Sequence, residues 1–325
     1  MDYLLFALGL TLLVFSGKYL VQGGVSIAKH LNIPTMVIGV TVIAFGTSAP
    51  ELLVSVQAAL SGSPEIAFGN VIGSNISNIG LVLAFTAILI PIPVHQNALR
   101  LDWPVMMIAS ILLYIFTFNN VLGFYEGLTL FALLIGYLYY TVSKSKKEVN
   151  NEQESKDEKA QYSLSISIVF VVVASIGLAL GANFLVDSAV NIATDWGVSK
   201  RVISITIVAF GTSVPELTAS IIAALKKQTD ISIGNIIGSN IFNIMAVLGI
   251  TSMIQEIHID HVAFAFDIIW MMFVSILLYL FIYPFKTVFL NRVEGVLLFI
   301  SYLIFVSLVL SGFDFESISS SFDFG

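Results

Sequence analysis

Apolar residues fall into ten long stretches separated by short polar segments, and this alternation dominates the chain. Each stretch has roughly the 17–25 residues that a helix needs to cross the hydrocarbon core of a bilayer. We therefore predict an all-α integral membrane protein with ten transmembrane helices. The predicted helices cover residues 3–24, 35–60, 66–92, 103–119, 124–143, 163–187, 201–225, 231–254, 264–284 and 294–312.

A polar segment at residues 144–162 divides these helices into two sets of five. The segment mixes charges of both signs and is almost free of large apolar residues, which is typical of a flexible connection. Because each set has an odd number of helices, the second must enter the membrane in the opposite sense, which gives an inverted-topology repeat. We predict repeats at 1–143 and 163–325, joined by a cytoplasmic linker at 144–162.

Composition supports the membrane class and excludes others. Hydrophobic residues make up 57% of the chain and charged residues only 11%, whereas a soluble domain is typically about 25% charged. The net charge of −7 comes largely from loops and termini, so it indicates neither nucleic acid nor an obligatory protein partner, and the predicted surroundings are a lipid bilayer. Without cysteine, the chain has neither a disulfide framework nor a thiolate metal site.

Two sequence patterns recur in both halves. The segment Val40–Glu51 (VTVIAFGTSAPE) returns 165 residues later as Ile205–Glu216 (ITIVAFGTSVPE), without a gap. The segment Gly69–Asn78 (GNVIGSNISN) returns at the same offset as Gly234–Asn243 (GNIIGSNIFN). Hydrophobic helices in general do not share Gly, Pro, Asn and Glu at matched positions, so these patterns indicate a true internal repeat.

Each copy of the first pattern places a proline and a carboxylate in the middle of an apolar helix. Pro50 has no N–H to donate, so the carbonyl of Gly46 loses its helical partner, and Pro215 does the same to Gly211. Non-helical backbone at membrane depth is tolerated only where it is buried in protein or lines a wet cavity. We expect the second, third, seventh and eighth helices to be broken beside such a cavity.

Oxygen-bearing groups share one face of the second helix. Ala44, Thr47 or Ser48, and Glu51 follow helical spacing, so this face offers freed carbonyls, hydroxyls and a carboxylate. An ionisable residue at membrane depth indicates a functional site by default. The alternative is an ordinary kinked helix in which Glu51 forms a salt bridge, but no Lys or Arg is predicted at that depth.

The third helix of each half has a matching polar face. Its amides and hydroxyls recur at i, i+4 and i+8, and the same spacing returns in the eighth helix. Such groups also hold membrane helices together, but their repetition beside the two glutamate helices favours a cavity lining. The residues on these faces are Asn70, Ser74, Asn78, Asn235, Ser239 and Asn243.

The paired GTSxPE patterns, each followed by GNxIGSN, resemble the two alpha repeats of the calcium/cation antiporter superfamily, in its sodium/calcium exchanger branch. The similarity covers nearly the whole chain. It implies secondary active antiport of Na⁺ and Ca²⁺ by alternating access, with no cofactor and no catalytic residue. It also implies that cations bind at the midplane, where two broken helices cross, and that the long first and sixth helices slide across the remainder.

The resemblance implies a specific set of ion ligands. Ca²⁺ is expected to bind the carboxylates of Glu51 and Glu216 with the backbone carbonyls of Thr47 and Thr212. Na⁺ is expected to share the two glutamates, and two asparagines complete the central site. The remaining implied ligands are Ala44, Ser48, Ser74, Asn78, Ala209, Ser213, Ser239 and Asn243.

Two positions depart from many relatives. Those relatives carry Asp at one or both of the positions of Asn78 and Asn243, and in K⁺-dependent exchangers such an Asp is tied to K⁺ use. Both residues are Asn here, which predicts transport without K⁺. The 144–162 linker is also far too short for the calcium-sensing cytoplasmic domains of animal exchangers, so that form of regulation is expected to be absent.

The chemistry of the implied ligands favours the same cargo. Two carboxylates among neutral oxygens suit Ca²⁺, which accepts six to eight oxygens in a flexible shell, better than Mg²⁺. A cavity without Cys or His is a poor site for transition metals. A channel and an intramembrane hydrolase are alternatives, but the inverted repeat favours alternating access. Within exchangers, Ca²⁺/H⁺ exchange is the second possibility, because glutamates can also carry protons.

Basic residues predict the orientation. With the N-terminus outside, twelve Lys and Arg residues fall on the inner side and only Lys200 and Arg201 fall outside, which satisfies the positive-inside rule. We predict a multi-pass protein of the cell membrane with both termini extracellular. The residues predicted inside are Lys18, Lys29, Arg100, Lys144, Lys146, Lys147, Lys156, Lys159, Lys226, Lys227, Lys286 and Arg292.

The other carboxylates near the predicted helices are expected to play lesser roles. A carboxylate at a helix N-terminus interacts favourably with the helix dipole, so we interpret four of them as caps or anchors. Asp187, near the outer end of the sixth helix, is a weak candidate for attracting cations. The four expected caps are Asp102, Glu126, Asp267 and Glu294.

Overall fold

The computed structural model describes residues 1–94, 98–151, 160–197, 209–259, 261–282 and 289–311. Within these residues, nine helices are long and apolar enough to cross a membrane, which confirms the all-α membrane class. The predicted seventh helix, 201–225, lies partly outside the described residues. Its described part is α10 (Ala209–Gly211) and α11 (Val214–Leu225).

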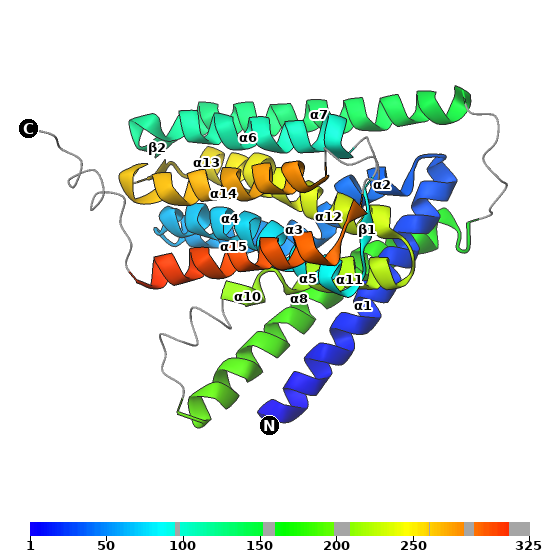
Figure 1. Ribbon diagram of the computed structural model, residues 1–325, viewed down its shortest axis with the longest axis horizontal. Helices are drawn as coiled ribbons and strands as arrows, with labels where there is room; N and C mark the ends of the chain where they lie inside the picture. Colours follow the sequence, from blue (N-terminus) through cyan, green and yellow to red (C-terminus); the bar gives the residue numbers. More distant parts are fainter. Residues whose placement is uncertain (95–97, 152–159, 198–208, 260, 283–288, 312–325) are drawn as a thin grey trace, which may run out of the picture.

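The helical segments follow one another along the chain with short strands between some of them (Figure 1). The first half has α1 (Asp2–Leu31), α2 (Thr35–Ile38), η1 (Gly39–Ile43), α3 (Ala44–Leu60), α4 (Pro64–Ser77), η2 (Asn78–Leu83), α5 (Ala84–Leu89), β1 (Ile92–Pro93), η3 (Ala98–Asp102), α6 (Trp103–Phe116), η4 (Thr117–Asn119), β2 (Val121–Leu122) and α7 (Phe124–Asn151). The second half adds α8 (Leu164–Asp195), α12 (Thr229–Phe242), η6 (Asn243–Leu248), α13 (Gly249–Ile254), β3 (Ile257–His258), α14 (His261–Ile282), β4 (Phe289–Leu290) and α15 (Arg292–Leu310) to α10 and α11.

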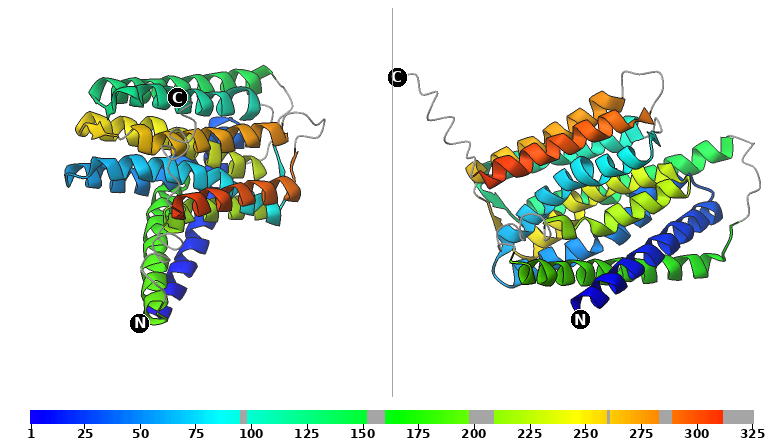
Figure 2. Two further views of the ribbon diagram at one scale, coloured as in Figure 1. Left: turned by 60° about the vertical axis from the view of Figure 1, so that its left-hand side comes forward. Right: turned by 60° about the horizontal axis from the view of Figure 1, so that its bottom comes forward.

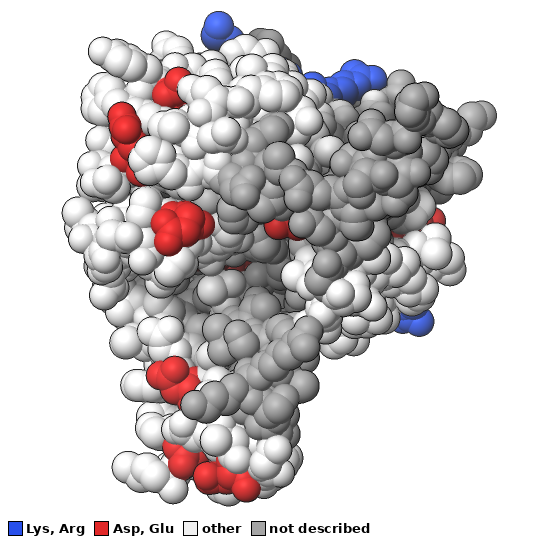
Figure 3. All heavy atoms as spheres, turned by 90° about the vertical axis from the view of Figure 1, so that its left-hand side faces the viewer, with Lys and Arg blue, Asp and Glu red and all other residues white. Residues whose placement is uncertain are grey.

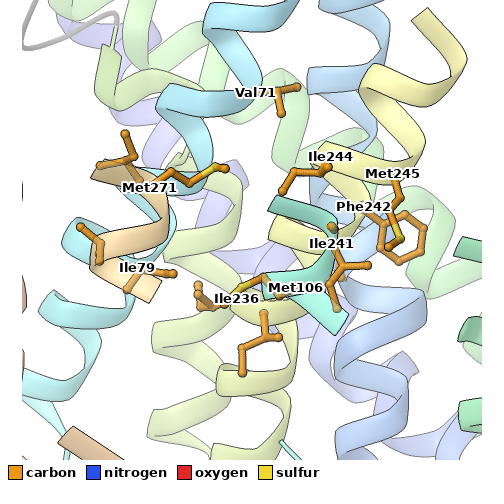
Figure 4. Close-up of a cluster of buried hydrophobic side chains, with 14 of the residues drawn as sticks. Val71, Ile79, Met106, Ile236, Ile241, Phe242, Ile244, Met245 and Met271 are labelled. Carbon is orange, nitrogen blue, oxygen red and sulfur yellow. The ribbon is translucent and has the colours of Figure 1, made fainter. Parts of the chain in front are cut away.

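The third helix of each half forms the centre of the molecule. In the most apolar window of Thr229–Ile254, 94% of the residues are buried, and in that of Pro64–Leu89, 78%, against 33% for α1. A helix that is apolar all round is expected to be buried. Side chains of α4, η2, α6, α12, η6 and α14 meet in the apolar core (Figure 4).

Glycine lets α12 approach the second helix closely. A Cβ atom added to Gly238 would lie 2.6 Å from the carbonyl oxygen of Val40 and 2.7 Å from the Cβ of Ala44. Backbones can come this near only where a small residue stands in the contact. The close approach brings the polar face of α12 against η1 and α3, the helix that carries Glu51.

Three of the four helices that were expected to break remain helical. Thr35–Leu60, Pro64–Leu89 and Thr229–Ile254 pass from α-helix into π-helix and back, through η1, η2 and η6. A π-helical turn changes the hydrogen-bond spacing without unwinding the chain, which is why these helices stay continuous. Only the seventh helix is broken as predicted, at residues 212–213 between α10 and α11.

The long helices α1 and α8 pack against each other and run obliquely to the remaining helices (Figures 1 and 2). They are antiparallel, since Asn191 near the end of α8 donates a hydrogen bond to Asp2 at the start of α1 (3.1 Å). A Cβ on Gly9 would lie 2.8 Å from the backbone nitrogen of Leu185. This close fit favours movement of α1 and α8 as one unit.

Two short antiparallel strand pairs connect the halves. Strand β1 pairs with β4, where Ile92 is opposite Leu290, and β2 pairs with β3, where Leu122 is opposite Ile257. Ile92 and Ile257 are separated by the repeat offset of the two sequence patterns. Each strand pair therefore joins the segment after the third helix of one half to the segment before the fifth helix of the other half.

Two of the four carboxylates expected to cap helices do so. Glu126 accepts a hydrogen bond from the backbone of Gly123, and Glu294 forms a capping box with Asn291. Asp102 stands at the N-cap position of α6 but makes no side-chain capping bond; it is buried, and its Oδ1 accepts from the hydroxyl of Tyr137 at 2.7 Å. Asp267 lies inside α14, beyond the first turn of that helix.

Candidate cation-binding site

The two repeat-related glutamates are buried in the middle of the molecule. Glu51 is 1% exposed in α3, and Glu216 is 0% exposed in the first turn of α11. Both carboxylate oxygens of Glu51 and Oε2 of Glu216 have no hydrogen-bond partner among the described groups. A buried charge without a partner costs several kcal/mol, and no described lysine pairs with either group. Among the described residues, Glu51 has no partner of the kind that an ordinary kinked helix with a salt-bridged glutamate would require.

Hydroxyl groups connect the glutamate helices to each other and to α12. The hydroxyl of Ser48 donates to Oε1 of Glu216 at 3.4 Å, so the first half contacts the carboxylate of the second. The Thr47 hydroxyl lies 3.1 Å from Oδ1 of Asn235 and 3.2 Å from the hydroxyl of Ser239. These contacts bring three predicted side-chain ligands, Ser48, Glu216 and Ser239, into one region with Thr47, whose backbone carbonyl is a predicted ligand.

Four asparagines form a reciprocal network where α4 and α12 cross. The Nδ2 atom of Asn75 donates to the backbone carbonyl of Asn240, and Nδ2 of Asn240 donates to that of Asn75, both at 3.2 Å. The Nδ2 atom of Asn78 donates to Oδ1 of Asn240 at 3.0 Å, and that of Asn243 to Oδ1 of Asn75 at 3.1 Å. Each of these four bonds therefore has a counterpart in the other half.

Six buried oxygens of the predicted ligand set remain without a hydrogen-bond partner among the described groups. Two carboxylates, two amides and one hydroxyl supply them, from both halves of the chain. Buried polar atoms in native proteins are nearly always paired, so each unpaired one requires an explanation. All six are oxygens, the kind of ligand that hard cations such as Ca²⁺ take. They are Glu51 Oε1, Glu51 Oε2, Ser74 Oγ, Asn78 Oδ1, Glu216 Oε2 and Asn243 Oδ1.

The other predicted ligands differ in how directly they face this set. The carbonyl of Ala44 accepts a hydrogen bond from Thr47 (3.2 Å), and Ser213 is hydrogen-bonded to Ser77 (2.8 Å). Thr212 lies in the break before α11, where its backbone is not helical. Ala209 begins α10, and its side chain lies outside the described residues.

A cavity of about 140 Å³ reaches one of the glutamates from the side of α8. Glu51 and Pro50 line it from α3, and Thr212 lines it from the break in the seventh helix. Asp187 and Asn183, one turn apart on α8, are exposed and line the same cavity. The weak candidate Asp187 therefore lies on the wall of a passage that leads to Glu51.

Sequence reasoning missed the roles of Asn75, Asn240, Asn235 and Ser77. Asn75 and Asn240 are repeated in the GNxIGSN pattern, and this repetition was the available signal. Asn235 was expected only as part of a cavity lining, yet its Nδ2 donates to Ser220 at 3.1 Å and it ties α12 to α11. Ser77 has no counterpart in the second half, where Phe242 stands, so its contact carries no repeat signal.

Comparisons with known proteins agree with this geometry. A family model described as "Sodium/calcium exchanger protein" matches residues 1–143 and 166–311. The putative antiporter CaxA of Alkalimonas amylolytica is 38% identical over 91% of this chain and 94% of its own length. The sodium/calcium exchanger MaX1 of Methanosarcina acetivorans is 30% identical over 94% of this chain and 97% of its own.

The fold also matches a solved structure. The sodium-calcium exchanger NCX_Mj, in crystals soaked without Na⁺ and Ca²⁺, superimposes with a TM-score of 0.80 at 34% sequence identity. The match covers 95% of this chain and 98% of that one. Similarity over nearly the full length of both chains means that the helices, and not only the repeated patterns, correspond.

Proposed function

The chain belongs to the sodium/calcium exchanger protein family, and on that premise we propose that it exchanges Na⁺ for Ca²⁺ without K⁺, with net movement of charge. Cation antiport involving Ca²⁺ follows from the family and from the matching structure. The finer claims rest on the residues of this chain. The observation that carries them is the set of six buried, unpaired oxygens supplied by both halves.

We assign Ca²⁺ to the region between Glu51 and Glu216. Ser48, one turn before Glu51 on α3, donates to Oε1 of Glu216, so both helices contribute to this region, and a divalent cation between the carboxylates would offset the cost of burying both charges. The oxygens of Asn78 and Asn243 approach from the third helices of the two halves. The backbone carbonyls of Thr47 and Thr212 are the further ligands that we propose.

Na⁺ binding uses the same glutamates together with neutral oxygens. Two carboxylates balance one Ca²⁺ or two Na⁺, and the hydroxyls and carbonyls around them accommodate further Na⁺ without added negative charge. Full Na⁺ loading then carries more positive charge than Ca²⁺ loading, so each cycle moves net charge. We assign these Na⁺ sites to Ala44, Ser48, Ser74, Ala209, Ser213 and Ser239.

K⁺ independence follows from the two amides of Asn78 and Asn243. An amide oxygen can ligate a cation, but it adds no negative charge to balance an extra one. Both amides already donate to asparagines of the opposite half, and the oxygen of each has no hydrogen-bond partner among the described groups. We therefore propose that this site takes no K⁺ with Ca²⁺.

We propose two inverted five-helix repeats, 1–143 and 163–325, with both termini outside and the 144–162 linker in the cytoplasm. The exchanged strand pairs β1–β4 and β2–β3 and the antiparallel helices α1 and α8 support this topology. On the face shown in Figure 3, the described acidic side chains lie at several places, and the described basic side chains that are visible lie at the edges. This distribution is what the positive-inside rule expects of an outer face. Lys156, Lys159, Lys200, Arg201 and Lys286 lie outside the described residues.

Alternating access is the proposed mechanism. The cavity beside Asp187 gives Glu51 access to one side of the membrane, next to the break in the seventh helix. Sliding of the tightly packed α1–α8 pair across the remaining helices would close this passage and open one on the other side. The cations would move from one aqueous phase to the other without a continuous pore.

Proteoliposomes containing the purified protein test this function. Vesicles loaded with Na⁺ are expected to accumulate Ca²⁺ from a Na⁺-free medium, and a potential that is negative outside is expected to accelerate uptake by drawing Na⁺ out. Ser110→Ala is the control variant, because the hydroxyl of this buried serine donates to the carbonyl of Met106 within α6. Uptake driven by a pH gradient without Na⁺ would instead support Ca²⁺/H⁺ exchange. Uptake that does not respond to the membrane potential would contradict net charge movement in each cycle.

A further inference from the structure

We propose that Asn75 and Asn240 are positioning residues that turn the ligand asparagines of the opposite half, so that an oxygen and not an NH₂ group faces the cations. Asn75 acts on Asn243, and Asn240 acts on Asn78. The proposal rests on the proposed function, since it concerns how the same cation site obtains its ligands. It goes beyond that function by giving a role to two residues that do not themselves ligate.

The backbone fixes the orientation of the Asn75 side chain. Its Nδ2 donates to the carbonyl of Asn240 at 3.2 Å and lies 3.6 Å from the sulfur of Met271, which is a weak acceptor. A backbone carbonyl has no hydrogen to donate. If the Asn75 amide were flipped, its oxygen would face that carbonyl oxygen, so only one of the two amide orientations is favourable.

Asn243 must therefore act as a donor. With its Nδ2 held by the backbone, Asn75 presents Oδ1 to Asn243, whose Nδ2 lies 3.1 Å away. A terminal amide that uses its nitrogen on one side has its oxygen on the other. Oδ1 of Asn243 is buried and has no partner among the described groups, so it is free for a cation.

The second half repeats the arrangement. Nδ2 of Asn240 donates to the carbonyl of Asn75 at 3.2 Å, and its Oδ1 accepts from Asn78 at 3.0 Å. Oδ1 of Asn78 is likewise buried and unpaired among the described groups. In both halves, a backbone carbonyl fixes the orientation of one asparagine amide, and that amide in turn fixes the orientation of the ligand asparagine.

The hydrogen-bond network also restricts which side chains fit at positions 78 and 243. Each position faces an acceptor oxygen, so it requires a donor, and a carboxylate would set oxygen against oxygen. Amides satisfy the requirement and keep both ligand positions neutral. The absence of charge at these positions is thus tied to Asn75 and Asn240, which lie in the opposite half of the chain.

A role in helix packing alone predicts a different pattern of energetic coupling. Asn75 and Asn78 are on the same helix, yet the hydrogen bonds run from each to the other half. Residues in contact couple energetically, whereas residues without shared partners are nearly additive. Asn75 should therefore couple more strongly with Asn243, from which it accepts a hydrogen bond, than with Asn78, to which it is linked only through Asn240.

Double-mutant cycles on Na⁺-driven Ca²⁺ uptake test this inference in proteoliposomes. Asn75→Ala and Asn240→Ala are each expected to raise the Ca²⁺ concentration at half-maximal uptake about tenfold, with the maximal rate little changed. Asn75→Ala/Asn243→Ala should match Asn243→Ala within about twofold, whereas Asn75→Ala/Asn78→Ala should come closer to the product of both single effects. Ser110→Ala, which bonds within its own helix, is the control.

Two results would overturn the inference. One is additivity in the Asn75–Asn243 pair, and the other is equal coupling in the two pairs. Asn243→Asp gives a second test if Asn75→Ala does not fold, since it leaves the bonds between Asn75 and the Asn240 backbone intact. With Asn75 present, the added carboxylate should not improve Ca²⁺ affinity, and a gain of about tenfold or more would refute the role of Asn75. If the wild type itself lacks Na⁺-driven uptake, the proposed function fails instead.

Discussion

The two GTSxPE segments have nearly the same sequence but different conformations. In the first, α3 continues through Pro50 and carries Glu51 in the middle of a 17-residue helix. In the second, the helix stops at Gly211, residues 212–213 form a turn, and Glu216 lies in the first turn of a new helix. The carboxylate of Glu216 accepts a bond from Ser48, while that of Glu51 has no partner among the described groups.

This difference shows that local sequence does not decide whether such a segment breaks. Pro50 and Pro215 remove the same hydrogen bond, yet only one helix opens. The break lies beside the passage that reaches Glu51 along α8. In an inverted repeat, an exchange of the two conformations between the halves would move that passage to the other side of the membrane.

Removing either carboxylate should have the largest effect. Glu51→Gln and Glu216→Gln are each expected to lower Ca²⁺ uptake at least about 100-fold, because each supplies half of the charge that balances Ca²⁺ in a buried site. Folding is expected to be retained, since an unpaired buried charge is replaced by a neutral group. Uptake in proteoliposomes and size-exclusion profiles measure the two properties. Near-normal uptake by either variant would mean that the two segments do not share a site.

The ends of the two glutamate helices should lie on opposite sides of the membrane. Ser61 and Lys226 are at matched positions just after α3 and α11. In this cysteine-free chain, Ser61→Cys is expected to react with an impermeant maleimide in intact cells about tenfold more than Lys226→Cys, which should react only after permeabilisation. Glu152→Cys, in the linker, should behave like Lys226→Cys. Equal labelling at the two matched positions would contradict the inverted topology.

The matched glycines test the conformational difference directly. A Cβ on Gly211 would lie 2.5 Å from a methyl group of Val186, and one on Gly46 would meet the hydroxyl of Ser175; both contacts are with α8. A serine hydroxyl can rotate away, whereas the side chain of valine is stiff at χ1. Gly211→Ala is expected to slow maximal uptake about fivefold, and Gly46→Ala by less than about twofold. A larger effect of Gly46→Ala would show that the conformational constraint lies in the first half and would contradict this prediction.

K⁺ should have the smallest effect. Because Asn78 and Asn243 add no charge, replacing choline by K⁺ is expected to change Na⁺-driven Ca²⁺ uptake by less than about 1.5-fold. Uptake in matched media with each cation measures this, and a several-fold rise with K⁺ would show that the amides do not exclude it.

Much of the fold followed from elementary patterns. The lengths of the apolar stretches predicted ten spans, and nine are present among the described residues. The repeated carboxylates identified two residues that are buried. Those predictions depend on one helix at a time. Glu51 and Glu216 stand out because a charge in an apolar helix is costly wherever the neighbouring helices lie.

What could not be predicted depends on contacts between distant segments. The π-helical turns that begin at Asn78 and Asn243 could not be predicted from a sequence pattern, and these helices were therefore expected to break. The role of Asp102 depends on Tyr137, which lies 35 residues further along the chain. The roles of Asn75 and Asn240 require the crossing of α4 and α12, which is set by packing.

Calorimetric titration of Ca²⁺ into purified wild type and the two Gln variants tests most directly whether the halves build one site. We expect a single Ca²⁺ per wild-type chain, displaced by Na⁺, and no measurable Ca²⁺ binding to either Glu51→Gln or Glu216→Gln. Ca²⁺ binding that survives in each single variant would show that the carboxylates belong to separate sites and would rule out one shared site.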